Sequence, residues 1–549
     1  MKRLFVLGYM AAAVLCLGSS QQSDSAGNLS ATDVFALSTL REAEMVKTLT
    51  KYTPLVETYL QLLEPDKELG AVPYSDKYFL GKLDLKKGIN DKSLLPEPGF
   101  PSRAKDWLTR FFSVQYVRTG FAQMIFVDDK RFDRGNYDFA YVRREFLGEV
   151  RCFVFDVKAK PKLARGFIGR IWVEDQNYNI VRFNGTYTPP SGSDVFFHFD
   201  SWRENMGPGL WLPAYVYVEE SDYRYFLGNR KLRFKGQTRI WGYDIGHSAP
   251  QEELTSLSVD SDQVRDDADV TENTAPVQNL RTWERLAEDN VLNRLQNAGL
   301  LAPEGPANKV LETVLSNIEI TNNLDIQPSV RARVLLTTPI ESFCIGHTVV
   351  LSRGLIDVLP DEASLATVLA HELAHISLGH QIDSKYAFND RMLFADEETF
   401  TNFGLKRDEK EEAAADKKAA EFLQNSPYKD KLGNAGLFLR ALNKRSAALP
   451  NLLEPHLGNA IARNKKVQRM PGLLKIAPEL EIGNVGQIAA LPLGSRLKID
   501  PWNDTIELLQ AKPVSLLSAQ EKMPFEIAPV FLHLTRQKEK ASVAAQNVP

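Results

Sequence analysis

The residues with the clearest chemical potential lie in the run His371-Glu372-Leu373-Ala374-His375. On an α-helix, residues four apart lie on one face, so His371 and His375 can reach the same metal ion. Glu372 lies beside them, where a carboxylate can take the proton of a water molecule that zinc has made acidic. Two imidazoles and a carboxylate at this spacing are typical of a catalytic zinc site. The sequence therefore predicts one Zn²⁺ per chain, with His371 and His375 as ligands and Glu372 as general base.

Catalytic zinc also needs a third protein ligand and one open position for water. Metzincins supply a third histidine six residues after the second one, where this chain has Gln381, so that class is excluded. A later alanine-rich segment, residues 410–421, is expected to be helical, and its Glu412 and Asp416 share a face. We expect Glu412 to be the third ligand and Asp416 to accept the free N–H of a ligand histidine. His380 lies about 180° round the motif helix from His371, and we expect it to support the site without binding the metal.

The motif needs a helix that begins shortly before it. Pro360 and Asp361 provide a turn and an N-cap, and apolar residues follow at helical spacing from Leu365 to Ile376. One face of this helix is expected to pack in a core while another presents the ligands.

Composition limits the kind of partner. The chain has 549 residues, of which 44% are hydrophobic and 25% charged, and its formal net charge is −4. Such a length predicts several domains, each large enough for its own core. The near balance of charges gives no cationic footprint for nucleic acid, so we expect no nucleic-acid partner.

The first residues predict export. Lys2 and Arg3 precede an apolar run that ends at Leu17, and small and polar residues follow, which is typical of a signal peptide. No later run is long enough to span a bilayer, so the mature chain is expected to have no transmembrane span and to lie in the periplasm or cell envelope of a bacterium, peripheral to a membrane at most. Lipidation at Cys16 is disfavoured because bulky Leu15 precedes it.

The rest of the chain divides into segments with different residue patterns. Periodicity predicts two short helices within residues 31–63, separated by Pro54, whereas runs such as residues 121–127, 151–157 and 215–218 predict strands. The expected fold class is α+β multidomain. Its expected segments are a signal peptide over 1–20, a helical N-terminal segment over 28–100, an antiparallel β half-barrel-like domain over 101–247, an acidic linker over 248–278, a mainly helical metallopeptidase domain over 279–475, and a small C-terminal β element and tail over 476–549, with a hairpin around residues 501–504.

Only two cysteines remain after the signal peptide, Cys152 and Cys344. They fall in different expected domains. We therefore expect two reduced thiols in separate cores rather than a disulfide.

The order HExxH, then ExxxD on an alanine-rich helix, resembles the zinc metallopeptidase family that contains the CAAX prenyl proteases, the HtpX-type heat-shock proteases and soluble periplasmic relatives. The resemblance covers about residues 280 to 470. It implies a gluzincin in which His371, His375 and Glu412 bind zinc, Glu372 is the general base and Asp416 supports a ligand histidine.

Two further roles come from the same resemblance. A later family histidine that approaches the metal or the oxyanion matches His456, although Leu457 stands where the family has proline, and a later arginine matches Arg463.

The segment Thr348–Leu355 resembles the family's edge strand, with which an extended substrate pairs through main-chain hydrogen bonds. Residues 387–407, with several phenylalanines, are a hypothetical lid over the cleft.

The β region resembles, less specifically, the half-barrel of lipoprotein-carrier and lipoprotein-sorting proteins. The resemblance depends on Gly169–Val173, Tyr178–Arg182 and Gly209–Pro213. It implies an apolar concave face that binds the acyl chain of a lipid or lipoprotein. A plain substrate-docking or structural β domain is an equal alternative.

The combined expectation is an exported zinc metalloendopeptidase that acts on misfolded or envelope polypeptides. The competing class is a periplasmic chaperone, assembly factor or lipid-binding factor whose zinc site is latent or closed. An intact Glu372 argues against that class, because a structural zinc site needs no general base. An aminopeptidase would need an amine-recognition motif, and none is visible in the sequence.

Overall fold

The structure is a computed structural model that describes residues 29–95, 121–243, 276–380 and 405–537, except for residues 68, 87–89, 129, 164–165, 188–197, 225–230, 482, 485–486, 488–496, 501–504 and 509–524. The expected signal peptide, nearly all of the acidic linker and most of the expected lid over 387–407 lie outside these residues. Within the described part, no helix has the length and apolar character needed to cross a membrane.

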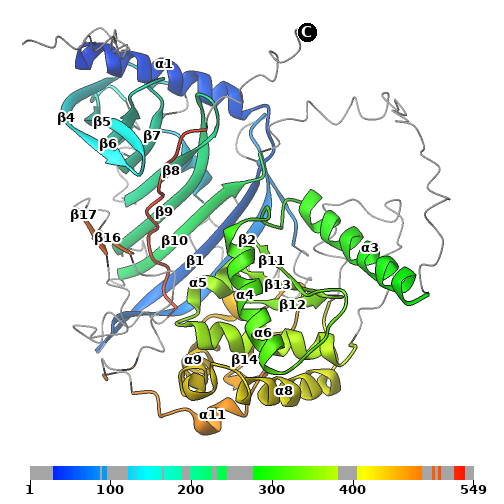
Figure 1. Cartoon of the computed structure of the whole chain (residues 1–549). Coiled ribbons are helices and arrows are strands. Elements are labelled where there is room, and N and C mark those ends of the chain that lie inside the picture. Colours follow the sequence, from blue (N-terminus) through cyan, green and yellow to red (C-terminus); the bar gives the residue numbers. More distant parts are fainter. Residues whose placement is uncertain are drawn as a thin grey trace, which may run out of the picture.

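A ten-stranded antiparallel sheet dominates the N-terminal half (Figure 1). Its spatial order is β3-β2-β1-β10-β9-β8-β7-β6-β5-β4, so β3 and β4 are its two edges and the sheet does not close into a barrel. The antiparallel architecture is as expected for the β region. The strands are β1 Leu55–Asp66, β2 Gly70–Asp84, β3 Asn90–Ser93, β4 Tyr137–Leu147, β5 Val150–Ala159, β6 Phe167–Glu174, β7 Ile180–Tyr187, β8 His198–Gly207, β9 Leu210–Arg224 and β10 Lys231–Trp241.

The expectation of a helical segment over 28–100 is wrong after residue 49. Helix α1 (Ala31–Leu49) is present, but the second expected helix is strand β1. Val56, Thr58 and Leu60 alternate along β1, and the strand pairs with β10 from Leu55↔Trp241 onward. That partner lies far away in the sequence, so local periodicity could not reveal it. The expected strand over 121–127 is likewise a short 3₁₀ helix, η1 (Ala122–Ile125).

The two faces of the sheet differ in composition. One face, which also packs against α1, carries a core rich in phenylalanine that includes Phe35, Phe155 and Phe183. The opposite face carries Trp172 and Trp202 and packs in the same core as the C-terminal half of the chain. We call this second surface the tryptophan face.

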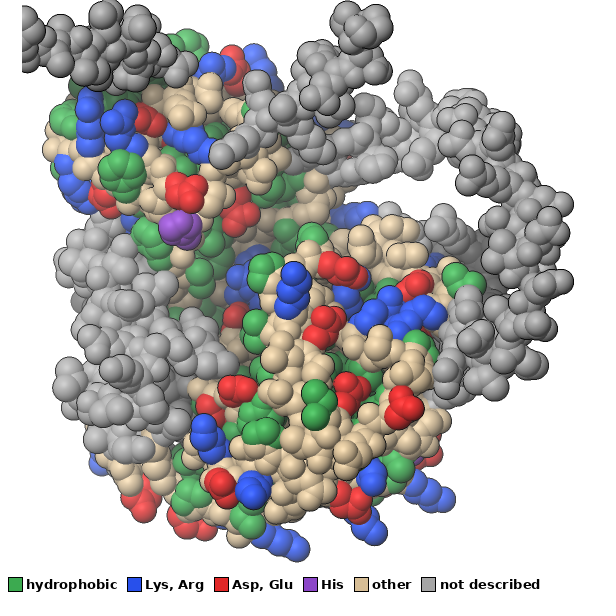
Figure 2. All heavy atoms as spheres, viewed as in Figure 1, with side chains coloured by type: hydrophobic (Ala, Val, Ile, Leu, Met, Phe, Trp, Pro, Cys, Tyr) green, Lys and Arg blue, Asp and Glu red, His purple; other side chains and the backbone are tan. Residues whose placement is uncertain are grey.

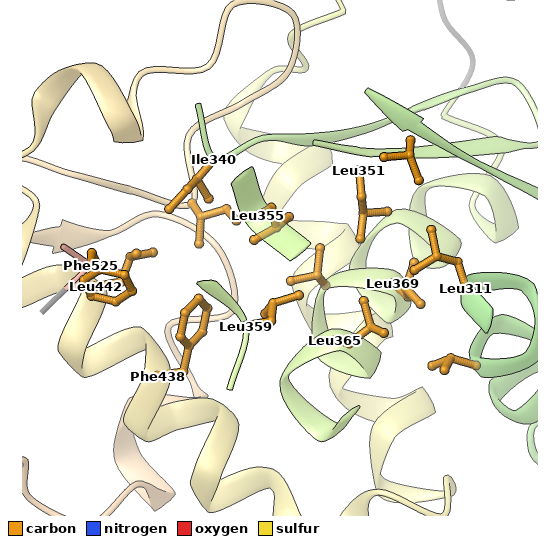
Figure 3. Packing of buried hydrophobic residues seen from close by; sticks show 14 of the residues in the cluster. Leu311, Ile340, Leu351, Leu355, Leu359, Leu365, Leu369, Phe438, Leu442 and Phe525 are labelled. Atoms are coloured by element: carbon orange, nitrogen blue, oxygen red, sulfur yellow. The ribbon is translucent and has the colours of Figure 1, made fainter. Parts of the chain in front are cut away.

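The C-terminal half is mainly helical around a three-stranded sheet of order β11-β13-β12. Figure 3 shows its core, to which Leu351, Leu355, Leu369 and Phe438 belong, and the ring centroids of Phe438 and Phe525 lie 6.2 Å apart. The elements are α3 Pro276–Asn297, α4 Pro306–Thr321, β11 Arg331–Leu335, β12 Ser342–Ile345, β13 Thr348–Ser352, α5 Arg353–Val358, α6 Glu362–Ser377, α8 Glu409–Gln424, η5 Lys429–Lys431, α9 Leu432–Arg445, α10 Pro450–Leu453, β14 Ala462–Arg463, β15 Lys466–Val467, α11 Leu473–Ile476, β16 Leu497–Asp500 and β17 Thr505–Leu508.

Two smaller expectations are confirmed. Strands β16 and β17 pair as the predicted hairpin, with Asp500 opposite Thr505. Cys152 and Cys344 are both buried free thiols. The viewed face of the molecule mixes basic and acidic side chains (Figure 2).

Carboxylates of the sheet bind the C-terminal half directly. Glu57 on β1 accepts hydrogen bonds from the N–H of Thr338 at 2.6 Å and from its hydroxyl at 2.8 Å. Asp76 on β2 accepts the N–H groups of Asn451 at 3.1 Å and Leu452 at 2.7 Å. Both carboxylates are nearly fully buried. The two halves therefore meet through satisfied polar groups as well as through apolar packing.

Candidate metal centre

Helix α6 begins where the sequence predicts. Asp361 is its N-cap, and the carboxylate accepts the N–H of Ser364 at 2.8 Å, which satisfies one of the free donors of the first turn. The helix packs against α4, α8 and α9, so it is buried on nearly all sides. His371, Glu372 and His375 are each at most 1% exposed.

Helix α8 brings the acidic residues of the second motif to α6. The expected helix over 410–421 is present, and its N-cap Asp408 accepts the N–H groups of Lys410 and Glu411. Oε2 of Glu412 lies 3.4 Å from Nε2 of His371, and Oε1 lies 3.4 Å from Nε2 of His375. One turn later, Oδ1 of Asp416 lies 2.9 Å from Nδ1 of His371.

These side chains suit a zinc ion. Nε2 of His371 and Nε2 of His375 are only 3.1 Å apart. Because Nδ1 of His371 donates its proton to Asp416, Nε2 of His371 carries a lone pair, and this nitrogen beside the carboxylate of Glu412 favours a cation. Ligands at about 2.0–2.1 Å in a tetrahedron are about 3.3 Å apart, close to the observed separations. His371, His375 and Glu412 thus form a candidate metal-binding group.

The carboxylate of Glu372 has two partners that the sequence analysis did not identify. The hydroxyl of Ser342 on β12 donates to Oε1 at 2.7 Å, and Nη1 of Arg469 donates to the same oxygen at 2.8 Å. Nε of Arg469 also donates to Glu412 at 3.1 Å. Arg469 therefore links Glu372, which lies beside the candidate ligands, to Glu412, which is one of them.

The electrostatics follow from this arrangement. Burial by itself would raise the pKa of Glu372, but Arg469 and the two imidazoles outweigh it and hold the pKa below its ordinary value. The same three groups hold the pKa of Glu412 well below its usual range. Both carboxylates are therefore ionised at neutral pH, which is the form that accepts a proton or binds a metal.

The structure also gives the positions of two other histidines, His380 and His456, and of Arg463. Nδ1 of His380 contacts Nδ1 of His375 at 2.9 Å, just after α6 ends, in keeping with a supporting place. His456 stacks on Tyr78 of β2 with ring centroids 5.5 Å apart, and its N–H binds Glu341. Arg463 pairs with Glu454 at the surface, whereas Arg469, six residues later, is the arginine at the candidate site.

The expected edge strand is not at an edge. Strand β13 lies between β11 and β12, so Thr348–Ser352 is already paired on both sides. The two edges are β11 and β12, and the Ser342 carbonyl of β12 accepts hydrogen bonds from Arg469 at 3.3 Å. Strand β12 was not predicted from the sequence, because it is short and all four of its residues are buried, so it shows no alternation between buried and exposed positions.

Comparison with solved structures and curated proteins adds little. A LolA superfamily protein from Nitrosomonas europaea aligns with 40% of this chain and 96% of its own, at 13% sequence identity and a TM-score of 0.20. At that score, the likeness is too weak to support the expected lipoprotein-carrier relationship. No curated protein matches the chain.

A family model is more informative. Residues 310–395 match the model described as peptidase family M48. The matched range runs from α4 to beyond α6 and includes His371, Glu372 and His375, while Glu412 and Arg469 lie outside it. The match and the geometry of the candidate metal-binding group together support a metallopeptidase.

Proposed function

We propose that this protein is an exported zinc-dependent metalloendopeptidase of the gluzincin type, which hydrolyses peptide bonds of misfolded or envelope proteins. The single observation that carries the proposal is the convergence of His371, His375 and Glu412 beside Glu372. A purely structural site gains nothing from an ionised carboxylate adjacent to its ligands.

The residues of the chain have separate tasks in this reaction. A zinc ion, when bound, would supply Lewis acidity toward the scissile carbonyl and lower the pKa of water. Glu372 takes a proton from the attacking water and returns it to the leaving amine. Asp416 holds His371 in the tautomer that has its lone pair on Nε2. Ser342 and Arg469 both bind Oε1 of Glu372, which fixes the orientation of the base.

One observation favours a second candidate, an assembly or lipid-binding factor with a latent site. The carboxylate of Glu372 is held by Arg469, and both ligand histidines are buried. An arginine on the general base lowers its proton affinity, so it opposes proton uptake until the contact weakens. This candidate predicts a protein that binds zinc and cleaves nothing.

The substrate and the location are part of the proposal. We infer that substrates are polypeptides and that the chain acts outside the cytoplasm, with lipid or lipoprotein as a further partner of the sheet. Support comes from the amino-terminal sequence pattern and the near balance of charges, which also makes nucleic acid an unsuitable partner.

Cleavage of an unfolded, casein-like substrate tests the proposal. The mature protein should cleave it, a chelated sample should not, and Glu372→Gln should retain zinc but lose cleavage. Zinc content measured by mass spectrometry distinguishes a loss of metal binding from a loss of cleavage. A zinc-loaded wild type that cleaves no peptide would favour the latent factor, and loss of zinc in Glu372→Gln would contradict the role of Glu372 as base.

A further inference from the structure

The last described segment, residues 525–537, crosses the tryptophan face of the large sheet (Figure 1, in red). We call it the C-terminal strap. It contacts Gln61 on β1, Trp202 on β8 and the turn between β4 and β5. Because the strap runs across the strands rather than along one, it cannot extend the strand ladder, and other groups must bind its main chain.

Side-chain amides bind the main chain of the strap. Nε2 of Gln61 donates to the carbonyl of Phe525 at 2.7 Å, and its Oε1 accepts the N–H of Ile527 at 2.7 Å. At the other end, Oδ1 of Asn205 accepts the N–H of Gln537 at 2.6 Å. An amide that uses its donor and its acceptor on one backbone recognises an extended chain whatever its side chains are.

Three further contacts select side chains. Glu526 pairs with Lys235 of β10 at 2.6 Å, near the start of the strap. The ring of Phe531 meets Trp202 edge to face, with centroids 5.0 Å apart. Near the end, Arg536 pairs with Glu174 at 2.8 Å and with Asp175 at 3.0 Å. The surface therefore selects an acidic residue, then an aromatic residue, then a basic residue.

The sheet fixes these recognising groups without help from the strap. Gln61 also donates to the hydroxyl of Tyr59 at 3.0 Å, a contact within β1. Glu174 accepts the N–H groups of residues 176, 177 and 179 in its own turn. Gly148 leaves room for the strap, because a Cβ atom there would lie 2.6 Å from the nitrogen of Leu534. The surface is organised in advance, as a ligand site is.

We propose that the tryptophan face of the sheet is a recognition surface for extended polypeptide segments, and that the strap is its intramolecular ligand. The partner is a stretch of unfolded polypeptide with the acidic, aromatic and basic residues of the strap in the same order. Tethering holds the strap at a local concentration of about millimolar, so a partner must compete with it. The proposal depends on contacts of the sheet and is independent of the metal centre.

Peptide binding to the full chain tests the proposal. The probe is a fluorescent synthetic peptide of residues 525–537, followed by fluorescence anisotropy. Arg536→Glu loosens the resident strap by repulsion from Glu174 and Asp175, and this variant should bind the peptide at least tenfold more tightly than wild type does. Adding Gln61→Ala should weaken binding at least tenfold, whereas the matched control Gln123→Ala, at an exposed position in η1, should not change it.

Further measurements test the sequence specificity of peptide binding and identify the results that would overturn the proposal. A peptide with its glutamate and arginine exchanged should bind at least tenfold more weakly. A folded Arg536→Glu variant that binds no peptide, or binds both peptides equally, would overturn the proposal. Self-association of the variant in size-exclusion chromatography in place of peptide binding would show exchange between copies and overturn it too. If Arg536→Glu does not fold, Glu526→Lys loosens the strap at its other end, against Lys235, and serves the same comparison.

Discussion

Arg203 in the large sheet and Arg469 beside the candidate metal centre are both buried cations with carboxylate partners. Arg203 forms two parallel hydrogen bonds with one carboxylate, Glu42 of α1, at 2.7 and 2.8 Å. Arg469 divides its donors among Glu372, Glu412 and Ser342, which come from α6, α8 and β12. The first arginine joins a helix to a sheet, whereas the second connects groups that could take part in a reaction.

The difference shows how a structural ion pair differs from a functional one. Two-to-two pairing holds one arginine against one carboxylate in a fixed geometry. An arginine shared between two carboxylates holds both ionised and close together, although like charges repel. Such sharing is most useful where one carboxylate binds a cation and the other exchanges a proton.

The largest expected effect is on the metal. Glu412→Ala should abolish zinc binding and all peptidase activity, because two histidines alone do not complete a catalytic zinc site. Zinc content after dialysis checks this prediction. Glu409→Ala, at an exposed position on the same helix, is the matched control and should keep its zinc. Full zinc retention in Glu412→Ala would remove Glu412 from the ligand set.

Arg203→Ala should lower the free energy of unfolding by about 3–5 kcal/mol, because it leaves the buried carboxylate of Glu42 without its cation. Cleavage per folded molecule should stay the same, since Arg203 is not at the site. Urea unfolding measures the change. The surface pair of Arg170 with Asp156 is the control, and Arg170→Ala should cost no more than about 1 kcal/mol. Equal costs for the two variants would break the comparison.

Glu341 adds a third buried carboxylate to the comparison. Its described hydrogen-bond partners are N–H groups instead of an arginine. Burial raises its pKa to about 7, although the N–H groups of residues 456–458 lower it. A pKa above its unfolded value means that the folded state takes up the proton. Stability from this group is therefore full below about pH 4.5 and is lost as pH rises through 7, roughly 3 kcal/mol in all. Glu341→Gln should remove this slope in urea unfolding between pH 5 and 8, and an unchanged slope would refute the assignment.

Arg469→Lys should lower kcat/KM by roughly 10- to 100-fold while zinc stays bound, because lysine keeps the charge but cannot contact Glu372, Glu412 and Ser342 together. Kinetics and zinc content on the same sample check this. An increase in activity would instead show that Arg469 restrains Glu372 in a latent site.

Asp416→Asn should weaken zinc binding by about 10- to 100-fold, because an amide is a poorer partner than a carboxylate for the N–H of His371. Competition with a chelator of known affinity measures the change. Lys417→Ala, at the exposed neighbouring position, should have no effect.

The candidate site was more predictable than its surroundings. His371, His375, Glu412 and Asp416 lie on two helices, where spacing alone determines which residues share a face, and the structure brings all four together. Arg469 lies in an irregular segment after β15, where no periodicity links it to Glu372. Its position depends on tertiary packing that the sequence does not display.

The errors in the fold concern strand pairing. Strand β1 has apolar residues at spacings that also fit a helix, and what makes it a strand is its pairing with β10 on one side and β2 on the other. At β1 a partner distant along the chain therefore outweighs the local pattern. The edge position expected for β13 came from a family resemblance, whereas in the structure β11 and β12 pair with β13 on its two sides.

The pairing of β1 with β10 also has a consequence for biosynthesis. A chain is made from its N-terminus, so β1 has no neighbour on that side until residues 231–241 have left the ribosome. The buried side chains of Glu57 and Gln61 then lack their partners Thr338 and Phe525 until those residues have been made. Chains that end before residue 525 leave the surface around Gln61 without the strap, whereas chains that contain residues 525–537 cover it. Proteolysis of the exposed surface would distinguish the two kinds of chain.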